Sequence, residues 1–299
     1  MIPFGRAVCY SGYREHQGPQ IKVYPTYEQV LEDLTILSKH FDYIRMYDPY
    51  EHAQTVLKVI KDHKIPLKVM VGVEPRGEIN NPSCPWGGLH SDEEIKFNKV
   101  FNYQQLDKLA ELCNKYEDII LAVAVGNECT SEWHANLMLP STIAKHVRYL
   151  KTKVKKPVTF CEGAYFFLKN GEEIAKAVDF ISIHSYPMWL KTPVKDSFNV
   201  TVNDYLLNTQ KYPGKHIIFT EFGWTTHADS KMNADEANEI NQNRYLTEVE
   251  AWSTQNKITM FVFEAFDEPW KGSANPDEPE KHWGIMDVKR KPKLYFSKK

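Results

Sequence analysis

Short apolar segments alternate with longer amphipathic segments along the whole chain of 299 residues. The short segments are rich in Val, Ile, Phe and Tyr, which favour buried strands, whereas the longer ones repeat their apolar residues at helical spacing. Eight strands are predicted in this way, at residues 5–10, 42–47, 67–73, 119–125, 157–161, 179–186, 216–221 and 258–265. Because eight alternating strands and helices close into a barrel, we predict an α/β fold, a single (β/α)8 TIM barrel over residues 1–299.

Two of the predicted helices carry start signals. Thr26 and Gln29 have the spacing of a capping box, in which each side chain bonds to the backbone N–H of the other residue. Asn233 and Glu236 are placed to cap the last long helix. No repeat, low-complexity segment or linker divides these elements, so we expect one domain.

Two connections are longer than the ordinary loop between a strand and a helix, which has about 2–6 residues. Residues 74–94 follow the third predicted strand and are rich in Gly, Pro and Asn, and residues 187–199 follow the sixth. In a barrel, the loops that follow strands lie at the face that carries the active site. We therefore expect extended loops after strands 3 and 6 to border a functional cleft.

The composition is that of an ordinary globular protein without a charged partner. The formal net charge is −2 and 25% of the residues are charged, so neither nucleic acid nor a membrane is expected as a partner. No apolar run approaches the ~18 residues that span a bilayer. The basic runs at 151–157 and 289–293 fit a solvated helix end and a tail. The five cysteines are scattered without metal-binding spacing, which predicts free, buried thiols.

Polar side chains end most of the predicted strands and would converge at one end of a barrel. They include Arg45, Tyr47, Asp48, Glu74, Asn127, Glu128, Glu162, His184, Tyr186, Glu221, Glu264, Asp267 and Glu268. So many carboxylates fit either a divalent metal site or a pair of glutamates that cleave a glycosidic bond. Aromatic residues beyond the strand ends favour the second chemistry, because ring faces can stack on sugars; they are Trp86, Trp133, Tyr165, Trp189, Trp224 and Trp270.

Two short motifs place a glutamate at a strand end. The fourth predicted strand ends in GNE (126–128), and the seventh ends in TEFGW (220–224). Together with IRMYDPY near the second strand and FVFEAFDEPWK with EKHWGIMDV near the C-terminus, these motifs resemble glycoside hydrolase family 17, of clan A. Within that family, the chain is most similar to bacterial, laminarinase-like β-1,3-glucanases. The resemblance implies a retaining mechanism without metal or cofactor, with Glu221 as the nucleophile and Glu128 as the acid/base.

The same resemblance implies further substrate-site residues. Glu268, Lys271 and Glu280 match positions of the family's C-terminal motif and would form a charge network that supports the acid. The remaining candidates for substrate binding are Tyr47, Trp86, Asn127, His184, Tyr186, Trp189 and Trp224. Asn127 is placed to bond the sugar 2-OH, and hydrogen bonds from His184 or Tyr186 would hold the nucleophile ionised. For Trp86 and Trp189, packing at the rim without a ligand role is an equally weighted alternative.

The first functional reading is hydrolysis of a laminarin-type β-1,3-glucan, with endo attack. Exo action is left open, because the insert at residues 74–94 could block one end of the cleft. A β-1,3-glucanosyltransferase that uses the same glutamates is the alternative, and a glucan-binding barrel without catalysis is a third reading. The expected partner is a β-glucan oligo- or polysaccharide, and no oligomeric state follows from the sequence. Since such a polymer meets its enzyme outside the cytoplasm, we expect an extracellular or periplasmic protein whose secretory signal has been removed.

Overall fold

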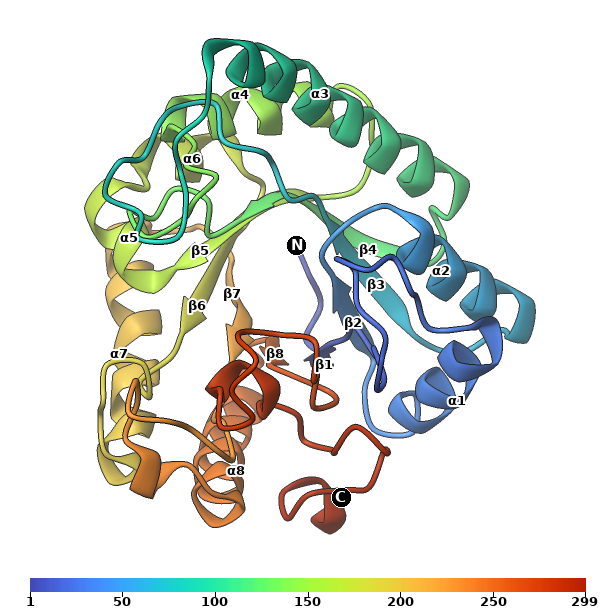
Figure 1. Ribbon diagram of the computed structural model, residues 1–299, viewed down its shortest axis with the longest axis vertical. Helices are drawn as coiled ribbons and strands as arrows, with labels where there is room; N and C mark the ends of the chain where they lie inside the picture. The colour runs from blue at the N-terminus through green and yellow to red at the C-terminus, as the bar shows by residue number, and fades with distance from the viewer.

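A computed structural model describes residues 1–299 as a closed barrel of eight parallel strands, each hydrogen-bonded to the next in chain order (Figure 1). The strands are β1 (Arg6–Cys9), β2 (Tyr43–Met46), β3 (Lys68–Gly72), β4 (Ile120–Asn127), β5 (Val158–Gly163), β6 (Ile181–Ser185), β7 (Ile217–Phe222) and β8 (Met260–Val262). Pairing of β1 with β8 closes the ring, so no strand edge is left exposed. The predicted (β/α)8 barrel is confirmed.

Helices surround the barrel and connect its strands. They are α1 (Tyr27–Leu37), α2 (Glu51–His63), α3 (Asp92–Lys115), α4 (Pro140–Lys151), α5 (Ala164–Asn170), α6 (Glu172–Ala177), α7 (Val194–Lys211) and α8 (Glu239–Asn256). Three short 3-10 helices complete the chain, η1 (Ala234–Glu236), η2 (Pro279–Lys281) and η3 (Phe296–Lys298). No helix combines the length and the hydropathy that a membrane span requires.

The helix starts agree with the sequence signals at one position and differ at another. The capping box of Thr26 and Gln29 is present at the start of α1. The last long helix is capped by Asn238, whose side chain accepts from Asn241 N at 2.9 Å. The prediction of Asn233 and Glu236 for this cap was wrong, because Asn233 precedes the separate 3-10 turn η1 and Glu236 is the last residue of that turn.

The two long connections are both shorter than predicted, because the helices that follow them begin earlier. Ser91 and Glu94 form a capping box that starts α3 at Asp92, so the first connection ends at residue 91. After β6, helix α7 begins at Val194, which leaves a loop of residues 186–193. The first connection still lies across one side of the barrel face, toward α5 and α6 in the view of Figure 1.

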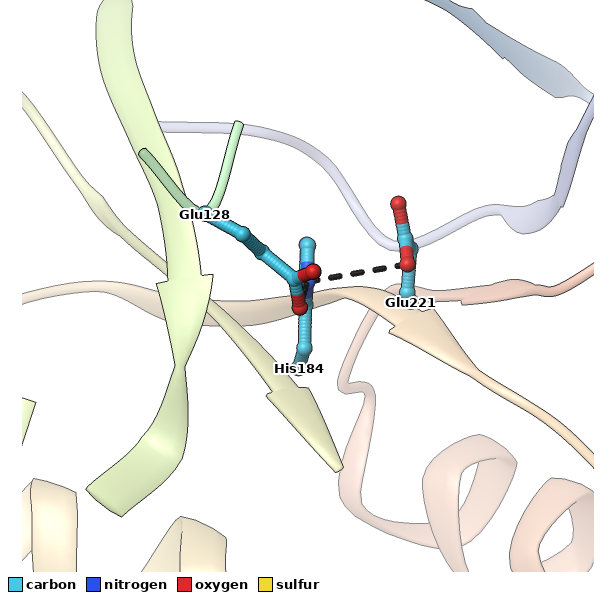
Figure 2. Close-up of side chains that lie close together, drawn as sticks. All are labelled: Glu128, His184 and Glu221. Atoms are coloured by element: carbon cyan, nitrogen blue, oxygen red, sulfur yellow. Dashed lines mark hydrogen bonds and ion pairs between the residues drawn. The ribbon is translucent and has the colours of Figure 1, made fainter. Parts of the chain in front are cut away.

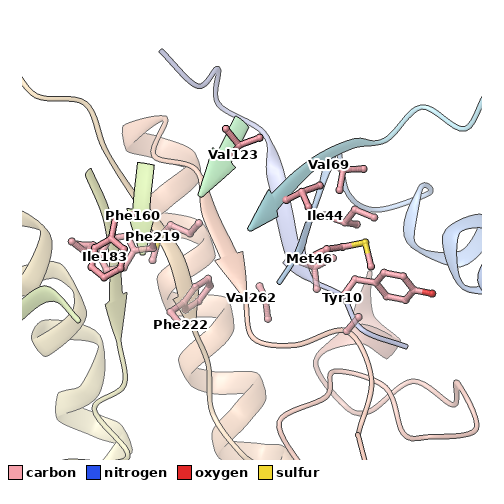
Figure 3. Packing of buried hydrophobic residues seen from close by; sticks show 14 of the residues in the cluster. Tyr10, Ile44, Met46, Val69, Val123, Phe160, Ile183, Phe219, Phe222 and Val262 are labelled. Carbon is pink, nitrogen blue, oxygen red and sulfur yellow. The ribbon is translucent and has the colours of Figure 1, made fainter. Parts of the chain in front are cut away.

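Buried side chains fill two layers, one inside the barrel and one between the strands and the helices. A cluster of 11 residues that includes Ile218 and Phe261 fills the barrel interior, and a cluster of 65 lies outside it. Figure 3 shows part of the outer layer, with Ile44, Phe219 and Phe222 among its residues. All five cysteines are buried and free, as predicted.

Alternation along the strands places Arg45 and Glu221 inside the barrel. On β2, Ile44 and Met46 face the outer layer, so the intervening Arg45 points inward. On β7, Phe219 and Phe222 both face the outer layer although they lie three residues apart, and the pairing with β8 shifts register between them. Without this bulge, Glu221 would face the helices as Phe219 does.

The C-terminal segment packs against the barrel and is held there by ion pairs. Arg290 forms an ion pair with Asp33 of α1 at 2.7 Å, and both side chains are almost fully buried. Lys293 is also buried and donates to Asp267 Oδ1 at 2.7 Å. The expectation of a solvated tail at residues 289–293 was therefore wrong, because two of its basic residues form ion pairs with the buried Asp33 and the partly buried Asp267.

Candidate active site

A single cavity of about 840 Å³ opens at the ends of the strands where the polar residues were expected to meet. Nine of the twelve predicted site residues line it, namely Tyr47, Trp86, Asn127, Glu128, Tyr186, Trp189, Glu221, Lys271 and Glu280. The barrel therefore brings together residues that lie far apart in the sequence, from β2 to the segment after β8.

Glu221 lies at the floor of this cavity, where its carboxylate accepts hydrogen bonds from three side chains. Arg45 Nη1 and Tyr47 Oη donate to Oε1, the latter at 3.0 Å, and Tyr186 Oη donates to Oε2 at 2.7 Å. Burial alone would raise the pKa of Glu221, but the charges of His184 and Arg45 and the bond from Tyr186 outweigh it and lower the pKa to about 2. Glu221 is therefore ionised at neutral pH, as a nucleophile must be.

Glu128 directly follows β4 and has a different environment. Its backbone adopts a left-handed conformation with φ 51°, and its N–H donates to Cys161 O at 2.9 Å. A glutamate in this region is uncommon, and such conformations concentrate at functional sites. Its side chain is 21% exposed, against 6% for Glu221, so it has access to a ligand in the cavity.

His184, at the end of β6, lies between the two glutamates (Figure 2). Its Nδ1 is 2.7 Å from Glu128 Oε1 and 3.6 Å from Glu221 Oε2. Burial would lower the pKa of His184, but the charges of the two glutamates raise it to about 10. The three groups have atoms within 4.8 Å of one another, with the imidazolium separating two carboxylates that would otherwise repel.

The same three side chains are close enough to share a metal ion. A histidine ligand must be neutral, however, because the metal takes the place of the proton on nitrogen. With a pKa of about 10, His184 keeps its proton at neutral pH. A metal ion at this position would have to displace that proton, and the three side chains as they stand form ion pairs.

Asn127 is the last residue of β4 and lines the cavity. The pairing of β4 with β5 shifts register just before it, between Ala124 and Asn127. Its Oδ1 accepts from Arg45 Nη2 at 2.5 Å. This bond fixes the orientation of the amide and leaves Nδ2 as a donor toward the cavity. Arg45 thus orients both Asn127 and Glu221 from beneath the site.

The segment after β8 supplies a second charged group centred on Lys271. Lys271 Nζ contacts Glu264 at 2.6 Å and Glu268 at 3.0 Å, and both glutamates are buried. Glu280 borders the cavity beside them, and burial, partly offset by Lys271, raises its pKa to about 7. The predicted association of Glu268, Lys271 and Glu280 is thus present in space, although Glu268 lies behind the cavity lining.

Comparison with protein families gives a match that covers most of the chain. Residues 7–284 match the model of the BtgE/BtgC glycoside hydrolase domain. The chain belongs to this family. The glycoside hydrolase assignment made from the sequence motifs is confirmed.

Relatives of this BtgE/BtgC-type domain include a fungal protein and two solved structures. An Aspergillus flavus protein described as "Probable glucan endo-1,3-beta-glucosidase btgC" is 23% identical over 91% of the chain, which spans 40% of that protein's length. An endo-laminarinase from Formosa Hel1_33_131 superposes with a TM-score of 0.83 at 23% identity, covering 98% of this chain and 86% of the other. A family 17 β-1,3-glucanosyltransferase from Rhizomucor miehei has a TM-score of 0.75 at 18% identity, covering 97% and 96%.

One predicted substrate residue of the BtgE/BtgC-type domain does not reach the cavity. Trp224 is fully buried in the outer layer, where its ring packs 5.4 Å from that of Tyr245 and its Nε1 donates to Glu236 O at 2.9 Å. A sugar cannot stack on it, so the prediction of a binding role for Trp224 was wrong. The preceding Gly223 is explained by packing, because a Cβ there would overlap the carbonyl of Phe263 and lie 3.2 Å from Trp283.

Other lining residues were missed as substrate-site candidates. Trp283, Phe263 and Tyr13 border the cavity, and the Trp283 ring lies 5.2 Å from that of Tyr186. Trp283 occurs within the quoted motif HWGIM, which was a signal that could have identified it. Tyr13 lies in the loop after β1, and no local pattern in the sequence marks that loop as part of the site.

Proposed function

We propose that this domain hydrolyses laminarin-type β-1,3-glucan with retention of anomeric configuration, using Glu221 as nucleophile and Glu128 as acid/base. The observation that carries this proposal is the position of two glutamates in one cavity, with carboxylate oxygens within 4.8 Å. Retaining glycosidases hold their carboxyl groups about 5–5.5 Å apart, whereas inverting ones need about 6.5–9.5 Å to admit a water molecule.

The first step forms a covalent glycosyl-enzyme. A Glu221 carboxylate oxygen attacks the anomeric carbon while the bond from that carbon to the leaving O3 breaks, and Glu128 gives its proton to O3. The hydrogen bond between His184 and Glu128 holds a proton at this position. Sugar binding expels water and favours neutral groups, so transfer of this proton from His184 to Glu128 would prepare the acid.

The second step releases the sugar. Glu128, now ionised, takes a proton from water as the water oxygen bonds to the anomeric carbon and the ester bond to Glu221 breaks. Asn127 Nδ2 would bond the sugar 2-OH, an interaction that strengthens in the oxocarbenium-like transition state. Tyr47 and Tyr186 would stabilise the returning negative charge on Glu221.

The names of the relatives support the substrate class and the endo mode. One is described as a glucan endo-1,3-beta-glucosidase and another as an endo-laminarinase. The four tryptophans that line the cavity without being buried, Trp86, Trp133, Trp189 and Trp270, suit stacking on several consecutive sugars. We further propose that the protein acts outside the cytoplasm, where such polymers occur, with a β-glucan as its partner.

The test is a time course of products from laminaripentaose, with anomeric configuration followed by proton NMR and Glu221→Gln as the control. Internal fragments that first appear as β-anomers are expected, and Glu221→Gln should fold normally while turnover falls by at least about a thousandfold. Products that first appear as α-anomers, or normal turnover in the variant, would refute the mechanism. Binding without turnover in the unaltered protein would instead favour a glucan-binding barrel.

A β-1,3-glucanosyltransferase is the second candidate, and one observation favours it. The Rhizomucor miehei glucanosyltransferase shares the fold over 97% of this chain. The same experiment separates the two functions, because a transferase makes products longer than laminaripentaose together with the short fragment released in the first step, whereas a hydrolase makes shorter products alone.

A further inference from the structure

Residues 74–91, within the connection between β3 and α3, are fixed to the loop that follows Glu128. We call residues 74–91 the β3 insert and residues 129–139 the β4 loop. Asn81 is buried, and its Nδ2 donates to Glu132 O at 2.6 Å and to His134 O at 3.0 Å. Cys84 Sγ donates to Trp133 O at 3.2 Å. The two bonds from Asn81 therefore hold the backbone of the β4 loop both before and after Trp133.

This arrangement presents two tryptophans to the cavity. Trp86 of the β3 insert is 67% exposed and Trp133 of the β4 loop is 47% exposed, and both line the cavity that contains the two glutamates. A tryptophan ring that serves packing alone is normally buried. Here hydrogen bonds to the backbone fix the two loops, while the tryptophan rings remain exposed to solvent. Exposed rings on a fixed loop are typical of a surface that binds an apolar ligand or the face of a sugar.

The position of Trp133 assigns these rings to one side of the bond that is cleaved. In a double displacement the nucleophile attacks the face of the sugar opposite the leaving group, and the acid lies on the leaving-group side. Trp133 is five residues beyond Glu128 in the same connection, and its neighbour His134 lies within the electrostatic reach of Glu128. A donor sugar that reacts with Glu221 would lie over this carboxylate and its tyrosines, which would leave the two tryptophans on the side of the acid.

We propose that Trp86 and Trp133 form the subsite for the leaving group and for an incoming acceptor sugar, so that the β3 insert controls transfer against hydrolysis. This inference rests on the proposed function. In transfer, an acceptor hydroxyl oxygen bonds to the anomeric carbon, the ester bond to Glu221 breaks and returns its electron pair to the carboxylate, and the hydroxyl proton passes to Glu128. Stacking on the two rings raises the local concentration of the acceptor, which competes with water for reaction with the glycosyl-enzyme.

The test uses 4-nitrophenyl β-laminaribioside as donor and laminaritriose as acceptor. Nitrophenol release measures formation of the glycosyl-enzyme, and mass spectrometry of the products measures the ratio of transfer to hydrolysis. The variants are Trp133→Ala and Trp86→Ala, with Trp133→Phe as the conservative change. Leu89→Ala is the matched control, because Leu89 is an exposed apolar residue of the same insert that does not line the cavity.

We expect each alanine variant to lower the transfer-to-hydrolysis ratio about tenfold, as loss of a stacked tryptophan commonly costs at least one decade of affinity. The KM for acceptor should rise in parallel, Trp133→Phe should recover most of the loss, and Leu89→Ala should match the unaltered protein. Alanine variants whose ratio stays within twofold of Leu89→Ala would overturn the inference. Absence of nitrophenol release that depends on Glu221 would instead refute the proposed function.

Discussion

Tyr186→Phe removes a short hydrogen bond to the nucleophile without changing the shape of the side chain. Tyr186 Oη donates to Glu221 Oε2 at 2.7 Å, and no other bond to that oxygen is comparably short, since His184 Nδ1 lies at 3.6 Å. The bond stabilises the ionised carboxylate more than the protonated one. Its loss should therefore raise the pKa of Glu221 from its low value.

The size of the rise follows from the strength of the bond. A hydrogen bond to a charged group contributes about 1.5–3 kcal/mol, and one pKa unit corresponds to about 1.4 kcal/mol. The pKa of Glu221, lowered to about 2 in the intact site, should rise by about 1–2 units in the variant. His184 and Arg45 remain, so the carboxylate stays ionised at neutral pH.

The assay is the pH dependence of kcat/KM for 4-nitrophenyl β-laminaribioside, since this quantity reports ionisations of the free enzyme. The acid limb should move to higher pH by the same 1–2 units, roughly. Tyr47→Phe, which removes a bond of 3.0 Å to an oxygen that Arg45 also binds, should give a smaller shift. An acid limb that does not move in Tyr186→Phe would refute the assignment of Tyr186 as a cause of the low pKa.

Stability should change in the same pH range. Because the folded pKa of Glu221 is depressed, its ionisation stabilises the fold above the unfolded value of about 4.3. This stabilisation is lost as the pH falls through the folded pKa of about 2. In Tyr186→Phe, the ionised Glu221 should contribute less to the free energy of unfolding, and this contribution should be lost at higher pH than in the unaltered protein. Thermal unfolding measured between these pH values tests this.

Two further predictions concern the acid and the buried ion pair. Glu128→Gln should slow cleavage of laminaripentaose by about 10²–10⁴-fold, whereas an aryl donor with a good leaving group should still release a burst of phenol. Added azide should then restore turnover and yield a β-glycosyl azide. A variant that shows neither the burst nor the rescue would contradict the assignment of Glu128 as the acid/base. Asp33→Ala leaves Arg290 buried without its carboxylate and should lower the free energy of unfolding by about 3–5 kcal/mol, measured by urea denaturation. Adding Arg290→Met should recover part of this loss, and an unchanged urea midpoint in Asp33→Ala would show that the pair contributes nothing.

The strands and the site residues at their ends could be predicted because both depend on local sequence. Parallel strands read as short apolar runs, and the polar residue that ends each run lies at the active face whatever the loops do. Glu128, Glu221 and His184 follow this rule, and the cavity contains or adjoins all three. Register shifts near the ends of β4 and β7 were not visible in the sequence, because they depend on pairing with neighbouring strands.

The errors arose where tertiary packing decides the outcome. Trp224 lies beyond a strand end, as the cavity tryptophans do, but the chain after β7 turns it toward Tyr245 in the outer layer. Arg290 and Lys293 look like a solvated tail because the carboxylates they meet lie far away in the sequence, at Asp33 and Asp267. Charge patterns along one segment carry no information on such partners.

The cluster of Glu128, His184 and Glu221 connects the stability of the barrel with its chemistry. At an effective dielectric constant of about 20, two unit charges that lie within 4.8 Å of each other repel by at least about 3.5 kcal/mol. With the same dielectric constant, a cation 2.7 Å from one carboxylate and 3.6 Å from the other gains about 6 and 4.6 kcal/mol. The attraction exceeds the repulsion, so the protonated histidine lets the two glutamates share one site. A neutral residue in its place would leave the repulsion uncompensated, and the buried nucleophile would lose charge more readily. The separation that retaining chemistry needs thus depends on His184 as much as on the strands that position the glutamates.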